Sequence, residues 1–355
     1  MNGWVVLFSL VLVGGFIAVG ALQRPAAPRT NPIDVSHIAP TVGQDIKVVM
    51  AMGDSMTAGF AIMGRSTISL LDEWRGLSGF VGGDPGAITL PNFFQHYSPD
   101  VIGASVGAHF LEWAGWDHHP EQDRLNAAQS NAGAIDLQSQ LDYLLAQIAA
   151  NPKIDMANDW KFLNLIIGAN DVCGLCFNKE LPPISSVGDY YERNLRNVIQ
   201  MASLKIPRLF FNILPMFNVS QVYWISQSSS YCANVHNVFP FECICAFDSN
   251  QQKRTYIDSI LVEFNKRIYK IAADWKARPS QTFAVQIQPF TANLIIPDTS
   301  YLSTLDCFHP SLLAHQKFAI SIWNSLVTPW AKKKQFFNPN DALLCPDANT
   351  LLYTD

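Results

Sequence analysis

Charged residues are scarce in this sequence of 355 residues. Asp, Glu, Lys and Arg make up 15% of it, and the formal net charge is −5. Proteins that bind nucleic acid carry clustered Lys and Arg, whereas the one basic run here, Lys332–Lys334, is typical of the solvated end of a helix. We therefore expect no nucleic-acid partner. Apolar residues make up 49% of the sequence, which is enough to bury a sizeable core.

Basic residues are also missing from the extreme amino terminus, where an apolar run extends from Trp4 to Leu22. An ideal signal peptide begins with such residues, although Val19-Gly20-Ala21 could end a cleavage site. The length of the run reaches that of a membrane-spanning helix. Residues 1–22 are therefore predicted to be either a cleaved signal peptide or an anchor retained through residues 4–22. Both place the protein on the secretory route, as a secreted protein or on the lumenal or extracellular side of a membrane.

The cysteines lack the two matched Cys-x-x-Cys pairs of a structural zinc site. An oxidising compartment favours disulfides, so we predict disulfides and no metal. The odd number, seven, leaves at least one thiol free or bonded to another chain. The disulfide candidates are Cys173, Cys176, Cys232, Cys243, Cys245, Cys307 and Cys345.

Two further surface features follow from the sequence. The adjacent pair His118-His119 is interpreted as an exposed loop, because neighbouring histidines rarely share one ligand geometry. The single sequon, Asn218-Val219-Ser220, makes Asn218 a candidate glycosylation site in a lumenal protein.

Strand-like and helix-like segments alternate after a linker at residues 23–44, which is rich in Pro, Thr and small residues. Buried strands separated by helices of this length predict a parallel sheet with helices on both faces. The predicted strands are 46–52, 162–167, 209–214 and 282–287, and the predicted helices are 134–150, 190–202, 253–275 and 311–330. Without repeats or a second core, residues 45–355 are predicted to form a single domain.

A serine follows the first predicted strand, in Gly53-Asp54-Ser55-Met56-Thr57-Ala58-Gly59. Ligands bind beyond the carboxyl ends of strands in such sheets, so Ser55 can be held exposed there. The segment is not the Gly-x-Ser-x-Gly elbow of α/β-hydrolases, because Gly59 falls four residues after the serine. By itself, Gly-Asp-Ser after a strand is more often an ordinary turn or helix cap than a nucleophile.

The other parts of a hydrolytic site lie further along the chain. Asp306 stands three residues before His309, and a hydroxyl nucleophile needs an imidazole base whose tautomer is fixed by a carboxylate. Asn170 follows another predicted strand and could donate to the oxyanion of a tetrahedral intermediate. Loss of one such donor costs about 2.7–4 kcal/mol. Each segment alone also fits an ordinary cap or loop, but together they form a chemically complete set.

The order Gly-Asp-Ser, Gly-x-Asn-Asp and Asp-x-x-His resembles the GDSL/SGNH hydrolase superfamily. More specific segments are similar to its phospholipase B branch, and the resemblance covers about residue 45 to the C-terminus. These segments are Trp74-Arg75-Gly76-Leu77-Ser78, Gly82-Gly83-Asp84, Thr89-Leu90-Pro91-Asn92, Asn170-Asp171-x-Cys173-x-x-Cys176, Asp306-Cys307-Phe308-His309 and Leu344-Cys345-Pro346.

This resemblance implies a three-layer α/β/α fold with a mostly parallel, flavodoxin-like central sheet. It makes Ser55 the nucleophile, His309 the base, Asp306 its orienter and Asn170 an oxyanion donor. The implied activity is that of a phospholipase or lysophospholipase without metal or organic cofactor, with an acyl ester as substrate and a membrane surface as a place of contact. The alternatives are an esterase for acylated carbohydrate or another small ester, and an inactive member that binds lipid or a partner protein. No oligomeric state is predicted.

One segment departs from the family pattern. The family places a glycine whose N–H completes the oxyanion hole in its second block. Aligned without a gap, the matching segment 126–136 has Asn131 at that position, and Gly133 fits only if the turn is two residues longer. A backbone N–H survives the change, and Asn tolerates left-handed backbone angles. We therefore expect Asn131 to provide the donor, with Gly133 as the alternative.

The resemblance also implies a disulfide pattern. It suggests that Cys173 pairs with Cys176, that Cys232 pairs with Cys243 or Cys245, and that Cys307 pairs with Cys345. The last bond would hold the C-terminal tail beside the loop that carries His309.

Overall fold

A computed structural model describes residues 45–66, 71–238, 240–278, 280–347 and 350–354. The predicted signal or anchor segment, 1–22, and the predicted linker, 23–44, lie outside these residues. Among the residues described, no helix combines the length and the apolar character needed to cross a bilayer.

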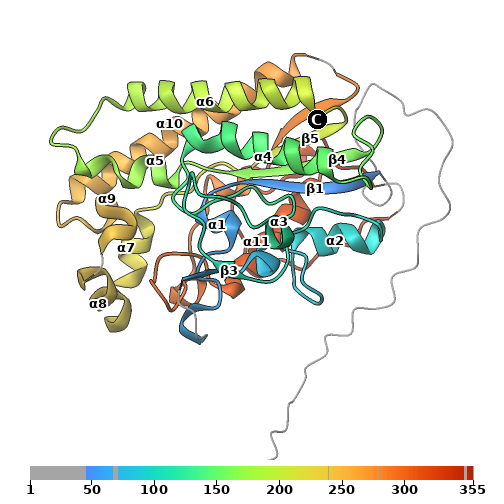
Figure 1. The fold of residues 1–355 in the computed structure, drawn as a ribbon. Coiled ribbons are helices and arrows are strands. Elements are labelled where there is room, and N and C mark those ends of the chain that lie inside the picture. The colour runs from blue at the N-terminus through green and yellow to red at the C-terminus, as the bar shows by residue number, and fades with distance from the viewer. Residues whose placement is uncertain (1–44, 67–70, 239, 279, 348–349, 355) are drawn as a thin grey trace, which may run out of the picture.

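Four parallel strands form the central sheet, in the order β1-β4-β5-β6 (Figure 1). They are β1 (Ile46–Gly53), β4 (Trp160–Ile166), β5 (Leu209–Ile213) and β6 (Phe283–Ile287). Nearly all of their residues are buried, as expected for a parallel sheet covered on both faces. The four predicted strands are confirmed, with ends that differ by one or two residues.

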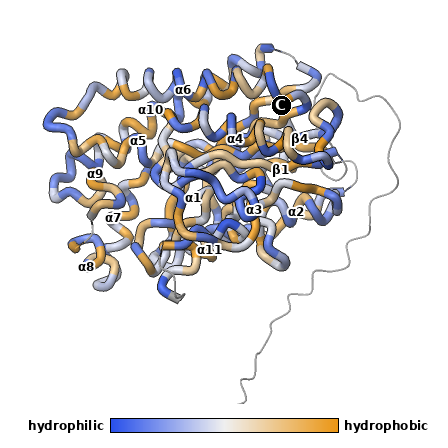
Figure 2. The backbone as a smooth tube through the Cα atoms, in the orientation of Figure 1, coloured by the Kyte–Doolittle hydropathy of each residue, from blue (hydrophilic) through white to orange (hydrophobic). Residues whose placement is uncertain are grey.

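Helices cover both faces of this sheet. Helices α4 (Leu137–Ala150), α6 (Ile184–Lys205) and α10 (Gln251–Lys276) lie together on one face (Figure 1). Helices α2 (Leu90–Tyr97) and α11 (Leu312–Leu326) pack against each other on the opposite side. Figure 2 shows hydrophobic residues along the strands and a mixture of hydrophilic and hydrophobic residues along the helices that cover them. The predicted three-layer α/β/α architecture is confirmed.

The predicted helix 311–330 is too long, because α11 ends at Leu326. Pro329 lies just beyond, and the residue before a proline is disfavoured in a helix. Several short elements were not predicted, since they are too short to show a hydrophobic period. They are α1 (Ser55–Ala58), α3 (Pro120–Asp123), α5 (Ala169–Cys173), α7 (Gln221–Ser226), α8 (Ser230–Val238) and α9 (Ile244–Phe247), with the antiparallel pair β2 (Asp72–Glu73) and β3 (His109–Phe110).

Three disulfides connect segments that are far apart in the sequence. They are Cys173–Cys243, Cys176–Cys245 and Cys232–Cys307. The predicted pairings Cys173–Cys176, Cys232 with Cys243 or Cys245, and Cys307–Cys345 are therefore wrong. The physical reason is that α5 packs against α9, so two cysteines near α5 face two near α9, and each bond crosses between the segments. Disulfides of this kind persist in proteins of the extracellular or lumenal space.

Hydrogen bonds, rather than a disulfide, join the C-terminal tail to α11. Trp323 Nε1 donates to the Leu344 carbonyl at 2.9 Å, and the Tyr353 N–H donates to the Leu326 carbonyl at 3.0 Å. Cys345 is exposed and free.

The basic run is less exposed than predicted. Lys333 is buried and donates to Gln288 Oε1 at 2.8 Å. The prediction that all of Lys332–Lys334 is solvated is therefore wrong for its middle residue.

Iodoacetamide should modify the native, unreduced protein at one thiol, Cys345, because the other cysteines are held in disulfides. Peptide mapping without reduction would detect one carbamidomethyl group on the Cys345 peptide and the three cross-linked peptides. An alkylated Cys307, or a peptide pair linked through Cys307 and Cys345, would contradict this connectivity.

Candidate active site

The turn after β1 fixes the position of Ser55. Asp54 is the N-cap of α1, and its carboxylate accepts a hydrogen bond from the Met56 N–H at 3.0 Å. Gly53 has a φ of 154°, and a Cβ at this residue would lie 2.7 Å from the Ile166 carbonyl oxygen. Only glycine fits there without displacing the neighbouring strand. Ser55 is thus held at the carboxyl end of β1 with 8% of its surface exposed.

Ser55, His309 and Asp306 form a continuous series of hydrogen bonds. Ser55 Oγ lies 2.8 Å from His309 Nε2, and His309 Nδ1 lies 2.5 Å from Asp306 Oδ2. The second carboxylate oxygen of Asp306 accepts from the backbone N–H groups of Phe308 (2.9 Å) and His309 (3.1 Å). Because Nδ1 donates to the carboxylate, Nε2 is free to accept the serine proton.

The charges of His309 and Asp306 stabilise each other. Burial lowers the pKa of His309, but the Asp306 carboxylate outweighs this effect and raises that pKa to about 9. Burial also raises the pKa of Asp306, and the neighbouring His309 brings it below its usual value. The proton therefore resides on the imidazole, which makes His309 a stronger base than an isolated histidine.

Helix α8 supports the loop that carries Asp306 and His309. His236 Nε2 donates to the Asp306 carbonyl at 2.9 Å, and His236 Nδ1 lies 3.1 Å from the Ser226 hydroxyl oxygen. Cys232, one turn earlier on α8, is bonded to Cys307. Burial lowers the pKa of His236 and keeps its ring neutral. None of these partners was predicted, because each lies about seventy residues from the loop in the sequence.

The candidate oxyanion donors lie on two neighbouring segments. Asn170 is in the first turn of α5, and its Nδ2 donates one hydrogen to the Ala132 carbonyl at 2.9 Å. Asn131 has a φ of 65°, in the left-handed region that Asn tolerates. The Gly133 N–H donates to Asp136 Oδ2 at 2.8 Å and is therefore already engaged. The structure thus joins Asn170 to the turn that contains Asn131.

Two further side chains hold these segments together and were not predicted as site residues. Gln140 accepts from the Gly53 N–H at 2.9 Å and donates to the Gly53 carbonyl at 2.8 Å. The Asp171 carboxylate accepts from the Ala134 N–H at 3.0 and 3.1 Å. Burial raises the pKa of Asp171 to about 7 and that of Asp54 to about 6. Asp171 was noted in the Gly-x-Asn-Asp segment, but the sequence did not show that it would bind the Ala134 N–H on a separate turn.

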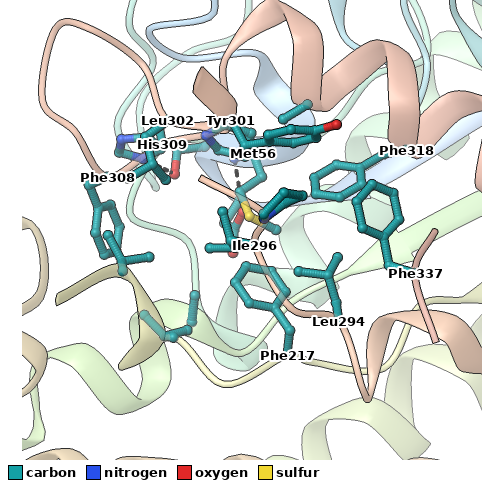
Figure 3. Close-up of a pocket in the computed structure, with 18 of the residues that line it drawn as sticks. Met56, Phe217, Leu294, Ile296, Tyr301, Leu302, Phe308, His309, Phe318 and Phe337 are labelled. Carbon is teal, nitrogen blue, oxygen red and sulfur yellow. Dashed lines mark hydrogen bonds between the residues drawn. The ribbon is translucent and has the colours of Figure 1, made fainter. Parts of the chain in front are cut away.

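An apolar pocket, the Ser55 pocket, opens beside the serine (Figure 3). Asn170 and His309 are among the described residues that line it. Asn131 is not one of them. The rest of the wall is almost wholly apolar. Its large side chains are Met56, Phe217, Leu294, Ile296, Tyr301, Leu302, Phe308, Phe318 and Phe337.

Acidic and histidine side chains gather in two places in the described part of the chain. One group consists of Asp306 and His309 with Glu242, and its members Asp306 and His309 already bond to each other and to Ser55. The other group lies beside β2 and β3, away from the Ser55 pocket. The hydrogen-bonded series can thus perform proton transfer with protein groups alone.

Asp171→Asn should stabilise the protein at alkaline pH. The folded-state pKa of about 7 lies above the ordinary value of 3.8, so the folded state binds this proton more tightly than the unfolded state. Ionisation of Asp171 therefore destabilises the fold as the pH rises through that interval. Asn keeps an oxygen for the Ala134 N–H and carries no charge.

Urea unfolding at about pH 5 and about pH 8 would measure the effect. The variant should gain stability relative to wild type at the higher pH, and the exposed control Asp100→Asn should not. An equal difference at both pH values would contradict the assignment of a buried charge to Asp171.

Comparisons with known proteins identify the family of the chain. The family model of the GDSL-like Lipase/Acylhydrolase matches residues 49–322. The membrane-associated phospholipase B1 of Rattus norvegicus is 30% identical over 339 residues, which are 91% of this chain and 22% of that protein. The Homo sapiens protein of the same name is 28% identical over 90% of this chain and 22% of its own length. The chain therefore spans about a fifth of the length of these curated relatives.

Among solved structures, an extracellular lipase from Streptomyces rimosus is 16% identical, with a TM-score of 0.39, over 79% of this chain and 99% of that one. The region matched by the family model contains Ser55, Asn170, Asp306 and His309. The chain belongs to the GDSL-like lipase/acylhydrolase family of carboxylic ester hydrolases, on the branch of the phospholipase B1 proteins.

Proposed function

We propose that this chain releases fatty acid from phospholipid or lysophospholipid through an acyl-enzyme on Ser55. The observation that carries the proposal is the hydrogen-bonded series of Ser55, His309 and Asp306 beside an apolar pocket. In this proposal Ser55 is the nucleophile, His309 is the base that Asp306 orients, and the apolar pocket receives the acyl chain.

In the first half of the reaction, Ser55 Oγ attacks the ester carbonyl carbon while His309 Nε2 takes the hydroxyl proton. The electron pair of the carbonyl moves onto its oxygen and forms a tetrahedral oxyanion. When this intermediate collapses, the bond to the alcohol breaks, and His309 gives its proton to the leaving oxygen. Asp306 stays ionised throughout and stabilises the imidazolium. The acyl group then remains on Ser55 as an ester.

In the second half, water replaces the alcohol. His309 takes a proton from the water, whose oxygen attacks the acyl carbon and forms a second oxyanion. Collapse returns the proton to Ser55 Oγ and releases the fatty acid.

Three donors are proposed for the oxyanion: the N–H groups of Ser55 and Asn131, and the second hydrogen on Asn170 Nδ2. Asn170 Nδ2 donates its first hydrogen to the Ala132 carbonyl, and this hydrogen bond fixes the orientation of the amide. The engagement of the Gly133 N–H by Asp136 favours Asn131 over Gly133. Donors fixed in advance need no reorganisation when charge develops.

The lipid assignment rests on the Ser55 pocket and on the relatives. A wall of Met, Phe, Leu and Ile side chains suits an acyl chain, which gains about 0.8 kcal/mol for each buried CH₂ group. The relatives are named phospholipase B1, membrane-associated, and we infer a similar substrate class for this chain. The three disulfides and the exposed Asn218 of the sequon support action outside the cytosol.

Ser55→Ala should abolish labelling by a fluorophosphonate probe and lower kcat by about 10⁶-fold, because the acyl acceptor is lost. The measurement is labelling of the purified protein, followed by fatty-acid release from phospholipid, lysophospholipid and short-chain esters. Ser185→Ala, which alters an exposed serine at the start of α6, is the matched control and should behave as wild type.

The other outcomes would change the proposal. Labelling with turnover of short or carbohydrate esters alone would keep the mechanism and replace the lipid substrate. No labelling and no turnover in folded protein with its disulfides intact would indicate an inactive member that binds lipid or a partner.

Activity should rise with pH as His309 loses its proton, because only the neutral imidazole can accept the proton of Ser55. The midpoint of kcat/KM should lie above the ordinary histidine value of 6.5, given the pKa of about 9. Asp306→Asn removes the carboxylate that raises this pKa and should lower kcat by about 10⁴-fold.

NMR titration of ¹³C-histidine-labelled protein would measure the His309 pKa without relying on turnover. The midpoint should fall to a lower pH in Asp306→Asn. An unchanged midpoint would contradict the role of Asp306.

A further inference from the structure

A second group of side chains lies beside β2 and β3 and is not used in the proposed hydrolysis. It consists of His109, Glu112, His118, His119 and Asp123, here called the ribbon cluster. Their side chains are 8%, 1%, 13%, 51% and 0% exposed, respectively. The prediction that His118 lies in an exposed loop is therefore wrong, because its ring stacks on Tyr143 with centroids 3.8 Å apart.

Four members of the ribbon cluster point their ligand atoms at one another. One atom each from His109, Glu112, His119 and Asp123 lies within 4.8 Å of all the others. His109 Nε2 is 2.9 Å from Asp123 Oδ1, and His119 Nδ1 is 2.7 Å from Glu112 Oε1. The rings of His109 and His119 stack with centroids 4.2 Å apart. Two imidazole nitrogens and two carboxylate oxygens thus converge on one small volume.

The buried charge around these atoms is strongly negative. Glu73, Glu112 and Asp123 are at most 1% exposed, and Arg75 is the one cation among them in the described residues. Three carboxylates and one guanidinium leave an excess of two negative charges if the histidines are neutral. Buried charge without compensation is unfavourable, so the site requires either a divalent cation or protons on two histidines.

The orientation of Glu112 favours a cation. Its Oε2 is buried without a hydrogen-bond partner in the described part of the chain, although it lies 3.0 Å from His118 Nδ1 and 3.4 Å from Arg75 Nη2. Arg75 Nη2 approaches Oε2, whereas Oε1 faces the ribbon cluster and accepts the His119 N–H at 2.7 Å. This places a fixed positive charge behind the carboxylate, in the manner of an outer-shell partner of a metal ligand.

We propose that the ribbon cluster binds one divalent transition-metal ion, Zn²⁺ in the first instance, through His109, His119, Glu112 and Asp123. Zn²⁺ takes four ligands in tetrahedral geometry and accepts both imidazole nitrogen and carboxylate oxygen. The ion replaces the proton shared by each His–carboxylate pair and neutralises the excess charge. His118 lies outside these four and stays beside Glu112 Oε2.

In this proposal the ion stabilises the segment that leads to Asn131. Ser130 donates its hydroxyl to Glu73 Oε1 at 2.6 Å and its N–H to the Glu112 carbonyl at 2.7 Å. Arg75 Nη1 donates to the Ala128 carbonyl at 2.8 Å. The ribbon cluster therefore holds, through Glu73, Arg75 and Glu112, the strand-like segment directly before the proposed oxyanion turn.

The test is metal analysis of the full chain, secreted from cells and purified without chelators or a polyhistidine tag. Inductively coupled plasma mass spectrometry should find about one Zn²⁺ per chain. After removal of metal by a chelator, added Zn²⁺ should raise the Tm, because an ion that binds only the folded state stabilises it. Neither readout depends on ester hydrolysis, so the result is independent of the proposed function.

His119→Ala is the informative variant, since its half-exposed ring can be removed without opening a buried gap. It should bind Zn²⁺ at least about tenfold more weakly. His96→Ala, which removes an exposed imidazole on α2, is the matched control and should bind as wild type does. Near-ultraviolet circular dichroism of both variants reports whether they are folded.

Two results would overturn the proposal. One is wild-type protein that contains no metal and whose Tm does not respond to Zn²⁺, Mn²⁺ or Ca²⁺, which would mean that protonated histidines balance the carboxylates. The other is folded His119→Ala that binds Zn²⁺ as tightly as wild type.

Discussion

The hydrogen bond between Ser55 Oγ and His309 Nε2 joins residues that are 254 positions apart in the sequence. It forms because β1 brings Ser55 to the carboxyl end of the parallel sheet, while the loop before α11 brings His309 to the same edge. The layered packing of α4, α6 and α10 on one face and α2 and α11 on the other fixes that edge. The proposed chemistry therefore depends on a long-range contact that the whole domain maintains.

Two buried carboxyl groups at this edge resist ionisation and also hold backbone turns in place. Asp54 and Asp171 are held where burial raises the pKa of each carboxyl group, and each binds the backbone N–H of a turn, at Met56 and Ala134. These bonds keep the turns of the proposed nucleophile and oxyanion donors in place before substrate arrives. The pKa of Asp306 is instead lowered, because the adjacent His309 compensates the charge of its carboxylate.

The sequence predicted the sheet, the long helices and the residues of the proposed mechanism, because these features depend on local pattern. A buried strand followed by Gly-Asp-Ser is visible without knowing what packs against it. The disulfides were mispredicted, since neighbours such as Cys173 and Cys176 face α9 rather than each other. His236, Gln140 and the ribbon cluster were missed for the same reason: each acts through a partner that the sequence alone does not bring near.

In the proposed mechanism, Ser55 carries the acyl group during turnover. The most direct measurement is acid quenching of the enzyme within milliseconds of mixing with lysophospholipid, followed by mass spectrometry of its peptides. We expect a fatty-acyl ester on the peptide that contains Ser55, formed and lost at rates that match turnover. Turnover without that adduct, or with the acyl group on another residue, would contradict this mechanism.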